Sequence, residues 1–446
     1  MKAIPTQSTA TLHAGAATVD VTPPGSVFLF GYPHVPRMST GVHDPLECAA
    51  LYLKREGTEV LLLANDIIFV SKSHTREIRR RIRERTGIRE EAIMITATHT
   101  HSGPLTAKCL SNAADPVVPE PDARYLELFT TRVVAAAEAA VRSAVPAEIG
   151  FALARSDGVG TNRHDPAGPA DPEVPVLVAR SLATGTPIAC MLVCAMHPTV
   201  LHEDSTLISA DFPGFTRRFL RQQALPPTCP VLYHQGASGN QSPRHVTRAN
   251  TFAEAQRLGE ILGRQVAAAL AGITYRHDAA VQVRGTTLEA VPRQFPTPEA
   301  AAQQVSLAVA RYARLKDEGA ARQTVRTAEC DVFGAEETAE LARAALDGRL
   351  SAAIVQCMPA EIQAVAIGPW TFVGWPGEFF VEYALDLRRR APGTFVITIA
   401  NGELQGYMVT EEAAARGRYE ATNAVFRPSN GPRFIEATLA LLGELR

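Results

Sequence analysis

The sequence predicts an α/β fold with central mixed β-sheets flanked by helices. Short runs of β-branched and aliphatic residues recur along the 446-residue chain. They are almost wholly apolar, as buried strands are. Amphipathic segments with helical spacing lie between several of them, and strands that alternate with helices are typical of an α/β core. The pattern leaves the direction of the strands open, so we expect mixed sheets.

Six apolar runs are predicted as strands and three segments as helices. The predicted strands cover residues 59–68, 92–97, 187–196, 230–236, 362–377 and 394–401. The predicted helices are a basic stretch that begins at His74, residues 123–144, and residues 253–272, with Gly272 as the C-cap. In the basic stretch, Ile78 and Ile82 at helical spacing favour a solvated helix face over a nucleic-acid contact.

Residues 296–347 form an Ala-rich, polar segment that is predicted to be helical. It opens with Thr297 as a cap residue and Pro298 at the first helical position. Because no Pro-, Gly- or Ser-rich linker flanks it, we interpret it as a helical insertion packed on a single domain that spans residues 1–446.

Composition and charge exclude several classes of function. A net charge of −2 gives no basic footprint for nucleic acid, and no apolar stretch approaches the roughly 20 residues of a membrane span. The N-terminus lacks the apolar core of a secretory signal, and the seven scattered cysteines fit buried thiols in a reducing compartment. We therefore expect a cytoplasmic protein without a stable membrane anchor. The sequence leaves open whether the protein forms a homo-oligomer.

Polar residues that can bind a ligand or take part in chemistry follow five of the predicted strands. They are His99 and His101, His197, Ser238 with Asn240 and Ser242, Glu378, and Tyr407. In open α/β sheets ligands bind beyond the carboxyl ends of strands, so these loops are expected to share one crevice. Two histidines one residue apart on an extended backbone also point the same way.

These residue types favour a catalytic zinc site. Neutral imidazoles and one carboxylate are zinc ligands that leave a position for water, and a nearby tyrosine can ligate the metal or stabilise an oxyanion. Each residue also has a structural interpretation: His197 as a satisfied core residue, Glu378 as an acid in a helix's first turn, and Tyr407 as a packed aromatic. Asp66 and His43 are further candidates for orienting a ligand histidine. The chain lacks the HExxH, GxSxG and P-loop patterns, which disfavours the common serine hydrolases.

The chain resembles the neutral ceramidase family in its zinc-bearing N-terminal catalytic domain. Eight segments match in order along the chain: residues 14–25, 31–46, 96–104, 161–166, 194–214, 239–244, 375–380 and 406–420. Among them are TATHTHSGP, TNRHDP, GNQSPR and WPGEFF.

The resemblance implies a role for each matching polar residue. The family's zinc ligands fall on four residues of this chain: His99, His197, Glu378 and Tyr407. His101 then lies beside the metal as an electrostatic or proton-handling group. Arg163 corresponds to a substrate-side arginine, Tyr419 to a second active-site tyrosine, and Ser242 to the serine of the family's G-D-x-S-P stretch.

The chain departs from the family at points that bear on the substrate. In GNQSPR, Asn240 replaces the acidic residue of the family's G-D-x-S-P stretch, and Arg244 stands where the family often has Asn. After HTHSGP, LTAKCL replaces the family's Gly-rich continuation. The β-sandwich domain and export signal of secreted ceramidases are also missing from the sequence, which makes membrane-resident ceramide a less suitable substrate.

The sequence thus predicts a zinc-dependent amidohydrolase that cleaves a linear carbon–nitrogen bond of a small N-acyl amide. His101 and Tyr419 would help to stabilise the oxyanion and Arg163 would orient a polar or anionic part of the substrate. Four alternatives stay open: hydrolysis of an ester, lactone or cyclic amide; a true ceramidase; Ser242 as a covalent nucleophile; and a non-catalytic metal-binding protein.

Overall fold

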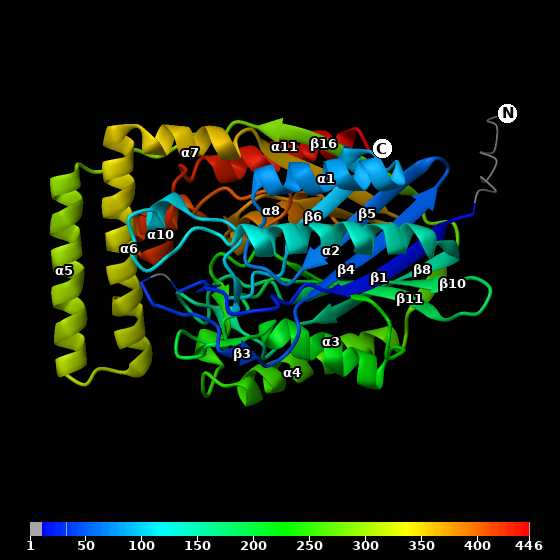
Figure 1. Cartoon of the computed structure of the whole chain (residues 1–446), viewed down its shortest axis with the longest axis horizontal. Coiled ribbons are helices and arrows are strands. Elements are labelled where there is room, and N and C mark those ends of the chain that lie inside the picture. Colours follow the sequence, from blue (N-terminus) through cyan, green and yellow to red (C-terminus); the bar gives the residue numbers. More distant parts are fainter. Residues whose placement is uncertain (1–10, 33, 446) are drawn as a thin grey trace.

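The computed structural model describes residues 11–32 and 34–445. Residues 1–10, on which the interpretation of the N-terminus partly rests, lie outside the described residues. Pro33, which belongs to one of the matching segments, also lies outside them. The described chain is a mixed α/β structure in which helices flank central sheets (Figure 1), and the predicted fold class is confirmed.

The larger sheet has nine strands in the order β13-β11-β10-β8-β1-β4-β5-β6, with β15 paired to β8. The pairs β5–β6 and β11–β13 are parallel, whereas the pairs between them are antiparallel. The bounds are β1 His13–Asp20, β4 Glu47–Arg55, β5 Thr58–Asn65, β6 Ile93–Ala97, β8 Val145–Arg155, β10 Glu173–Ser181, β11 Pro187–Cys194, β13 Val231–Gln235 and β15 Thr274–Arg276.

A second sheet has the order β16-β17-β18-β20, with β18 and β20 parallel. Its strands are β16 Val281–Leu288, β17 Ala360–Ile367, β18 Trp370–Gly374 and β20 Thr394–Ile397. The run predicted as one strand over residues 362–377 is two strands, because the chain turns at Gly368, whose φ is +57°. The remaining described strands are two residues long and pair with one another: β2 Leu29–Phe30, β3 Gly41–Val42, β7 Gly103–Pro104, β9 Thr161–Asn162, β12 Leu207–Ile208, β14 Gln241–Ser242, β19 Glu378–Phe379 and β21 Tyr407–Met408.

The carboxyl ends of β6, β13 and β20 converge. The backbone N–H of Thr398, just after β20, donates to Gln235 O of β13 at 2.8 Å, and Ala97 N of β6 donates to Ile399 O at 3.2 Å. The segment after β20 therefore bridges two strands at opposite ends of the nine-strand order. This closure brings the loops that follow the strands to one place.

Helices cover the sheets on both sides (Figure 1): α2 packs on β1 and β4, while α4 packs on β8 and α3. The bounds are α1 Lys72–Thr86, α2 Ala123–Arg142, α3 Asp211–Gln223, α4 Phe252–Leu270, α8 Val381–Arg390, α9 Glu411–Arg416, α10 Tyr419–Asn423 and α11 Asn430–Gly443, with short 3-10 turns η1 Glu90–Ala92, η2 Leu110–Asn112 and η3 Pro243–His245. The predicted cap of α4 is wrong: the helix ends at Leu270 and its C-cap is Ala271 in a right-handed conformation. No left-handed residue is needed there, so Gly272 has no capping role.

The predicted helical excursion is present as α5 Pro298–Asp317 and α6 Arg322–Asp347, followed by α7 Arg349–Cys357. The Thr297 side chain caps α5 by accepting from Ala300 N, with Pro298 in the first turn as predicted. The α5–α6 pair stands at one end of the molecule (Figure 1), and α6 packs on α10 and η2.

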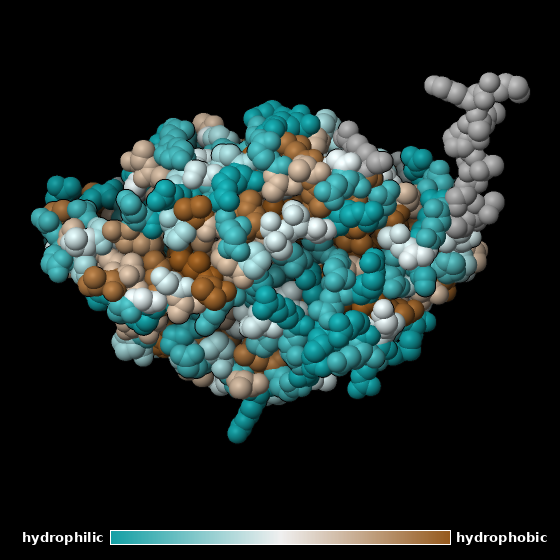
Figure 2. Space-filling model, turned by 90° about the horizontal axis from the view of Figure 1, so that it is seen from above, coloured by the Kyte–Doolittle hydropathy of each residue, from teal (hydrophilic) through white to brown (hydrophobic). Residues whose placement is uncertain are grey.

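The described helices include none with the length and hydropathy that crossing a bilayer requires. Hydrophilic and apolar residues are interspersed over the face shown in Figure 2, with apolar patches nearer the end that carries α5 and α6.

Candidate active site

Two histidines and one glutamate meet where the strand ends converge. His99 follows β6 and His197 follows β11, and Nε2 of each faces Oε2 of Glu378 in β19, at 3.3 and 2.9 Å. All three residues are buried, with exposed fractions of 1, 0 and 7%. Three segments that are far apart in the sequence therefore share one point.

Backbone carbonyls fix which ring nitrogen carries the proton. Nδ1 of His99 donates to Ile68 O at 2.9 Å. Nδ1 of His197 donates to Ser238 O at 2.7 Å. A neutral imidazole has one N–H, so both Nε2 atoms are left as acceptors, the form that a metal ligand needs. Burial lowers the pKa of His197 to about 4, which keeps this ring neutral at pH 7.

The carboxylate of Glu378 faces these two acceptors. Burial by itself would raise the pKa of Glu378, whereas positive charge at the positions of His99 and His197 holds this pKa well below its usual range. A carboxylate oxygen and a ring nitrogen that are both acceptors do not attract each other directly, so this arrangement suits a cation between them. The donor set, imidazole nitrogens and one carboxylate, fits a divalent transition metal such as zinc.

The loop that carries His99 is held in an uncommon conformation. His99 has φ of +68°, in the left-handed region, and its backbone N–H donates to Ile67 O at 3.0 Å. Thr98 donates to Asp66, which pairs with Arg217, so Asp66 supports the loop backbone rather than an imidazole. Such conformations persist where the surrounding contacts determine them, as here.

His101 completes a cluster of three imidazoles. Its ring centroid lies 4.9 Å from that of His99 and 5.9 Å from that of His197. The ligand atoms of the three residues all lie within 4.8 Å of one another, and among the described residues only this group has such an arrangement. Both ring nitrogens of His101 are buried without a hydrogen-bond partner in the described structure, and burial lowers its pKa well below the usual value. The three histidines can hold a metal ion.

A glycine makes room for His101. Gly31 has φ of +124°, and a Cβ at this position would lie 2.5 Å from Cγ of His101. A further neighbour of the ring is Tyr32, whose ring centroid is 5.3 Å away in an edge-to-face arrangement. The segment after β2 thus positions this histidine, and only a residue without a side chain permits the approach.

The two tyrosines lie close together beside Glu378. Tyr407 is the register partner of Glu378 in the β19–β21 pair, and its ring centroid lies 5.8 Å from that of Tyr419. Burial raises the pKa of both tyrosines well above the usual value, so both hydroxyls keep their protons at neutral pH.

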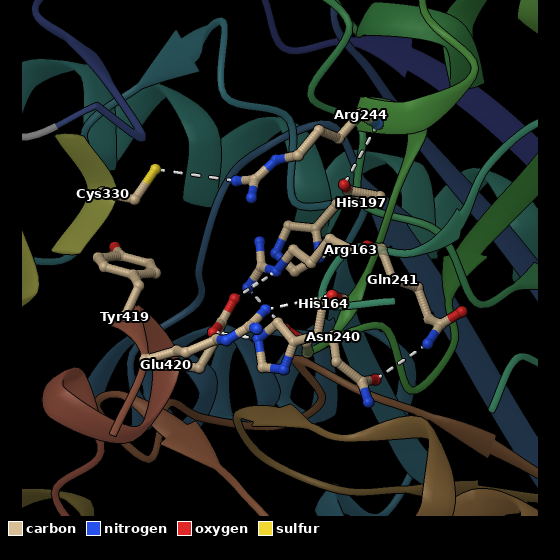
Figure 3. Close-up of polar contacts among 12 residues, drawn as sticks. Arg163, His164, His197, Asn240, Gln241, Arg244, Cys330, Tyr419 and Glu420 are labelled. Carbon is tan, nitrogen blue, oxygen red and sulfur yellow. Dashed lines mark hydrogen bonds and ion pairs between the residues drawn. The ribbon is translucent and has the colours of Figure 1, made fainter. Parts of the chain in front are cut away.

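Arg163 lies over the Tyr407 ring and is anchored on its other side by Glu420. The guanidinium carbon is 5.3 Å from the ring centroid, and Nε is 2.5 Å from Oε1 of Glu420. The second carboxylate oxygen of Glu420 lies 2.5 Å from Nε2 of His164 (Figure 3). Arg163 Nη2 also donates to Gly239 O at 2.6 Å. The charge of Arg163 is therefore balanced by Glu420 within the protein.

A cavity of about 440 Å³ opens beside these residues. Five of the predicted site residues line it: His101, Arg163, Ser242, Tyr407 and Tyr419. His99, His197 and Glu378 are buried and do not line it. The opposite wall is the first half of α6, including Arg326, Cys330 and Phe333. The helical excursion therefore forms part of the candidate active site.

Ser242 lies on the cavity wall but has a structural contact. Its Oγ accepts from the backbone N–H of Arg244 at 3.3 Å, which caps η3. Within the described residues this is the hydrogen bond that its hydroxyl makes, and no imidazole lies within hydrogen-bond distance to act as a base. His43, another sequence candidate, stacks on Phe252 at 3.8 Å between ring centroids and does not join the cluster.

Sequence reasoning missed Glu420, His164 and Gly31, and it left open how the helical segment that contains α6 shapes the pocket. Glu420 ends one of the matching segments and His164 lies in TNRHDP, so their positions in the motifs were a usable signal. For α6 no local signal exists, because its contacts with the site join residues that are far apart in the chain.

The chain is similar in sequence and in fold to known ceramidases. Residues 12–230 match the family model described as neutral/alkaline non-lysosomal ceramidase, N-terminal. The fold is similar to that of neutral ceramidase from Pseudomonas aeruginosa, with a TM-score of 0.74 and 16% identity over 97% of this chain and 74% of that one. It is also similar to a structure described as ceramidase complexed with C2, with a TM-score of 0.72 and 16% identity over 97% of this chain and 75% of that one. No curated protein matches the sequence. Residues 12–230 therefore match the neutral/alkaline non-lysosomal ceramidase family model, and the described chain shares the fold of neutral ceramidase.

Proposed function

We propose that the protein is a zinc-dependent hydrolase that cleaves the linear amide bond of an N-acyl substrate. The observation that carries this proposal is that Nε2 of His99 and Nε2 of His197 both face the buried Glu378 carboxylate. These groups lie beside His101, which lines the cavity. In this proposal His99, His197, Glu378 and Tyr407 hold the metal. When bound, zinc polarises a carbonyl and makes water acidic enough to act as a nucleophile near pH 7.

The chain's own residues supply the remaining chemistry. His101 is neutral at pH 7 and both its ring nitrogens lack partners in the described structure, so it can accept a proton from attacking water and pass it to the leaving amine. The Tyr419 hydroxyl stays protonated and can donate to the oxyanion that forms on the carbonyl. Arg163, held by Glu420, keeps the Tyr407 ring in place.

We assign Ser242 a wall and capping role rather than that of a nucleophile, because its hydroxyl accepts a backbone hydrogen bond. All seven cysteines are free thiols, which a reducing compartment maintains, and we place the enzyme in the cytoplasm on that ground.

A substrate panel with the zinc-loaded protein tests this function. The panel contains N-octanoylglycine, N-octanoylsphingosine, the octanoyl ester of glycolic acid and a small lactam, and product release is measured for each. We expect hydrolysis of the linear amides. Cleavage of the ester or the lactam alone would contradict the proposed bond, and no turnover of any compound would favour a binding protein.

Variants separate the metal site from proton transfer. His101→Ala is expected to keep its metal and lose turnover, whereas His99→Ala loses both. His277→Ala, an exposed histidine, is the control and should resemble the wild type. Full turnover by His101→Ala would contradict the role given to this residue.

A further inference from the structure

The candidate active-site cavity carries more positive than negative charge. Four arginines and two glutamates line it: Arg163, Arg244, Arg322, Arg326, Glu203 and Glu329. Both glutamates are paired with Arg326, at 2.7 and 2.8 Å from its Nη1. Arg163 is paired with Glu420. Two arginines therefore face the cavity without a carboxylate partner among the described residues.

The contacts of these two arginines leave most of their hydrogen-bonding capacity unused. Arg244 Nη2 lies 3.8 Å from Cys330 Sγ, a weak acceptor, and Figure 3 shows the side chain reaching across the hollow toward that residue. Arg322 Nη2 lies 3.3 Å from Asn250 Oδ1. A guanidinium offers five N–H donors, and neither neutral contact balances its charge.

The two arginines come from elements that meet at the cavity. Arg244 belongs to η3, two residues after Ser242, and Arg322 is the first residue of α6. Asn250, from the segment after η3, accepts from Arg322 and so ties the start of α6 to that segment. On α6, Arg322 and Arg326 lie one turn apart and so share the helix face that lines the cavity.

We propose that the amide substrate carries an anionic group, a carboxylate, which Arg244 and Arg322 bind. The proposal rests on the proposed function, because it names the substrate class of the same site. A planar guanidinium fork matches a carboxylate with two parallel hydrogen bonds, and an excess of positive charge in a cavity concentrates anions. Arg163 is less suited to this role, since Glu420 balances its charge and Gly239 O accepts from its Nη2. The substrate class is therefore that of N-acyl amino acids rather than neutral N-acyl sphingoid bases.

Non-hydrolysable sulfonamides test the proposal without turnover. The probes are N-octylsulfonylglycine, its neutral analogue N-octylsulfonylglycinamide, and N-octylsulfonylphosphoethanolamine, each titrated into the zinc-loaded protein by calorimetry. We expect the glycine compound to bind about ten- to hundredfold more tightly than the glycinamide. Equal affinity for the two, or binding of neither, overturns the proposal. Tight binding of the phosphate compound alone overturns the assignment to a carboxylate.

Variants locate the anion site. Arg244→Gln is expected to lower the affinity ratio by about tenfold, and Arg322→Gln to lower it as well. Arg248→Gln is the matched control: Arg248 lies on the same segment, is exposed and does not line the cavity, so the ratio should persist. An unchanged affinity ratio in both cavity variants overturns the proposal. Equal affinity of the wild-type protein for the charged and the neutral probe also overturns it, without any variant.

The same preparations are assayed for hydrolysis of N-octanoylglycine and N-octanoylglycinamide. A binding preference without hydrolysis of either amide contradicts the proposed function alone. Hydrolysis of both amides with equal kcat/KM contradicts the anionic substrate alone.

Discussion

Replacing Glu420 by glutamine removes the charge that holds Arg163 in the buried wall of the active site. Glu420 is 4% exposed in its side chain, and its two oxygens meet Arg163 Nε and His164 Nε2, each at 2.5 Å. Burial alone would raise the pKa of Glu420, but Arg163 and His164 outweigh it and lower this pKa to about 2. The variant leaves the buried guanidinium without its counter-charge.

The size of the effect follows from that pKa. A decrease from 4.5 to about 2, at about 1.4 kcal/mol per pH unit, corresponds to about 3 kcal/mol of stability from the ionised carboxylate. Because the folded-state pKa is depressed, this stability is fully present above about pH 4.5 and is lost as the pH falls from there toward 2. We therefore expect Glu420→Gln to be about 3 kcal/mol less stable than the wild type at pH 7, and the difference to shrink at pH 3.

Equilibrium urea unfolding at both pH values measures the difference. Glu436→Gln is the matched control, because Glu436 forms an arginine pair with Arg390 at the surface, where solvent screening leaves it little effect. A Glu420→Gln protein as stable as the wild type at pH 7, or one equally destabilised at pH 3 and pH 7, would refute the reasoning.

Three further predictions concern the site and its surroundings. Gly31→Ala places a Cβ against His101 and is expected to lower kcat/KM about a hundredfold, so full activity in a steady-state assay would show that this contact is unimportant. Burial raises the pKa of Glu337 to about 8, so the stability of the wild-type protein should fall as the pH rises from 4.5 to 8. Thermal melts of Glu337→Gln should lack this dependence on pH, and the same dependence in the variant would show that Glu337 is not its source. Ser242→Ala should lose about 1 kcal/mol of capping stability and keep most of its turnover, whereas abolished turnover would revive the nucleophile hypothesis.

The parts of the fold that the sequence predicted are the buried ones. Strands such as β6 and β13 are buried at every position, and they appear as continuous apolar runs. By contrast, β8 has several exposed residues and was missed, because its mixed composition resembles that of a loop. The strands β1, β4 and β10 were missed as well, although β4 and β10 are mostly buried.

The candidate site was predictable as far as its residues follow strands. His99, His197 and Glu378 come directly after such runs, and the structure brings them together. Contacts between distant segments had no signal in the pattern. Arg163 was assigned to a substrate anion, but its partner is Glu420, from a helix near the end of the chain. The cavity wall on α6 likewise depends on how the helical excursion packs.

The most direct test of the central claim is the metal content of the purified protein. Elemental analysis after zinc loading and gel filtration is expected to give about one zinc per wild-type chain, less in Glu378→Gln, and none in a His99→Ala, His197→Ala double variant that still folds by circular dichroism. If the folded double variant retained the wild-type zinc content, the metal site proposed here would be contradicted.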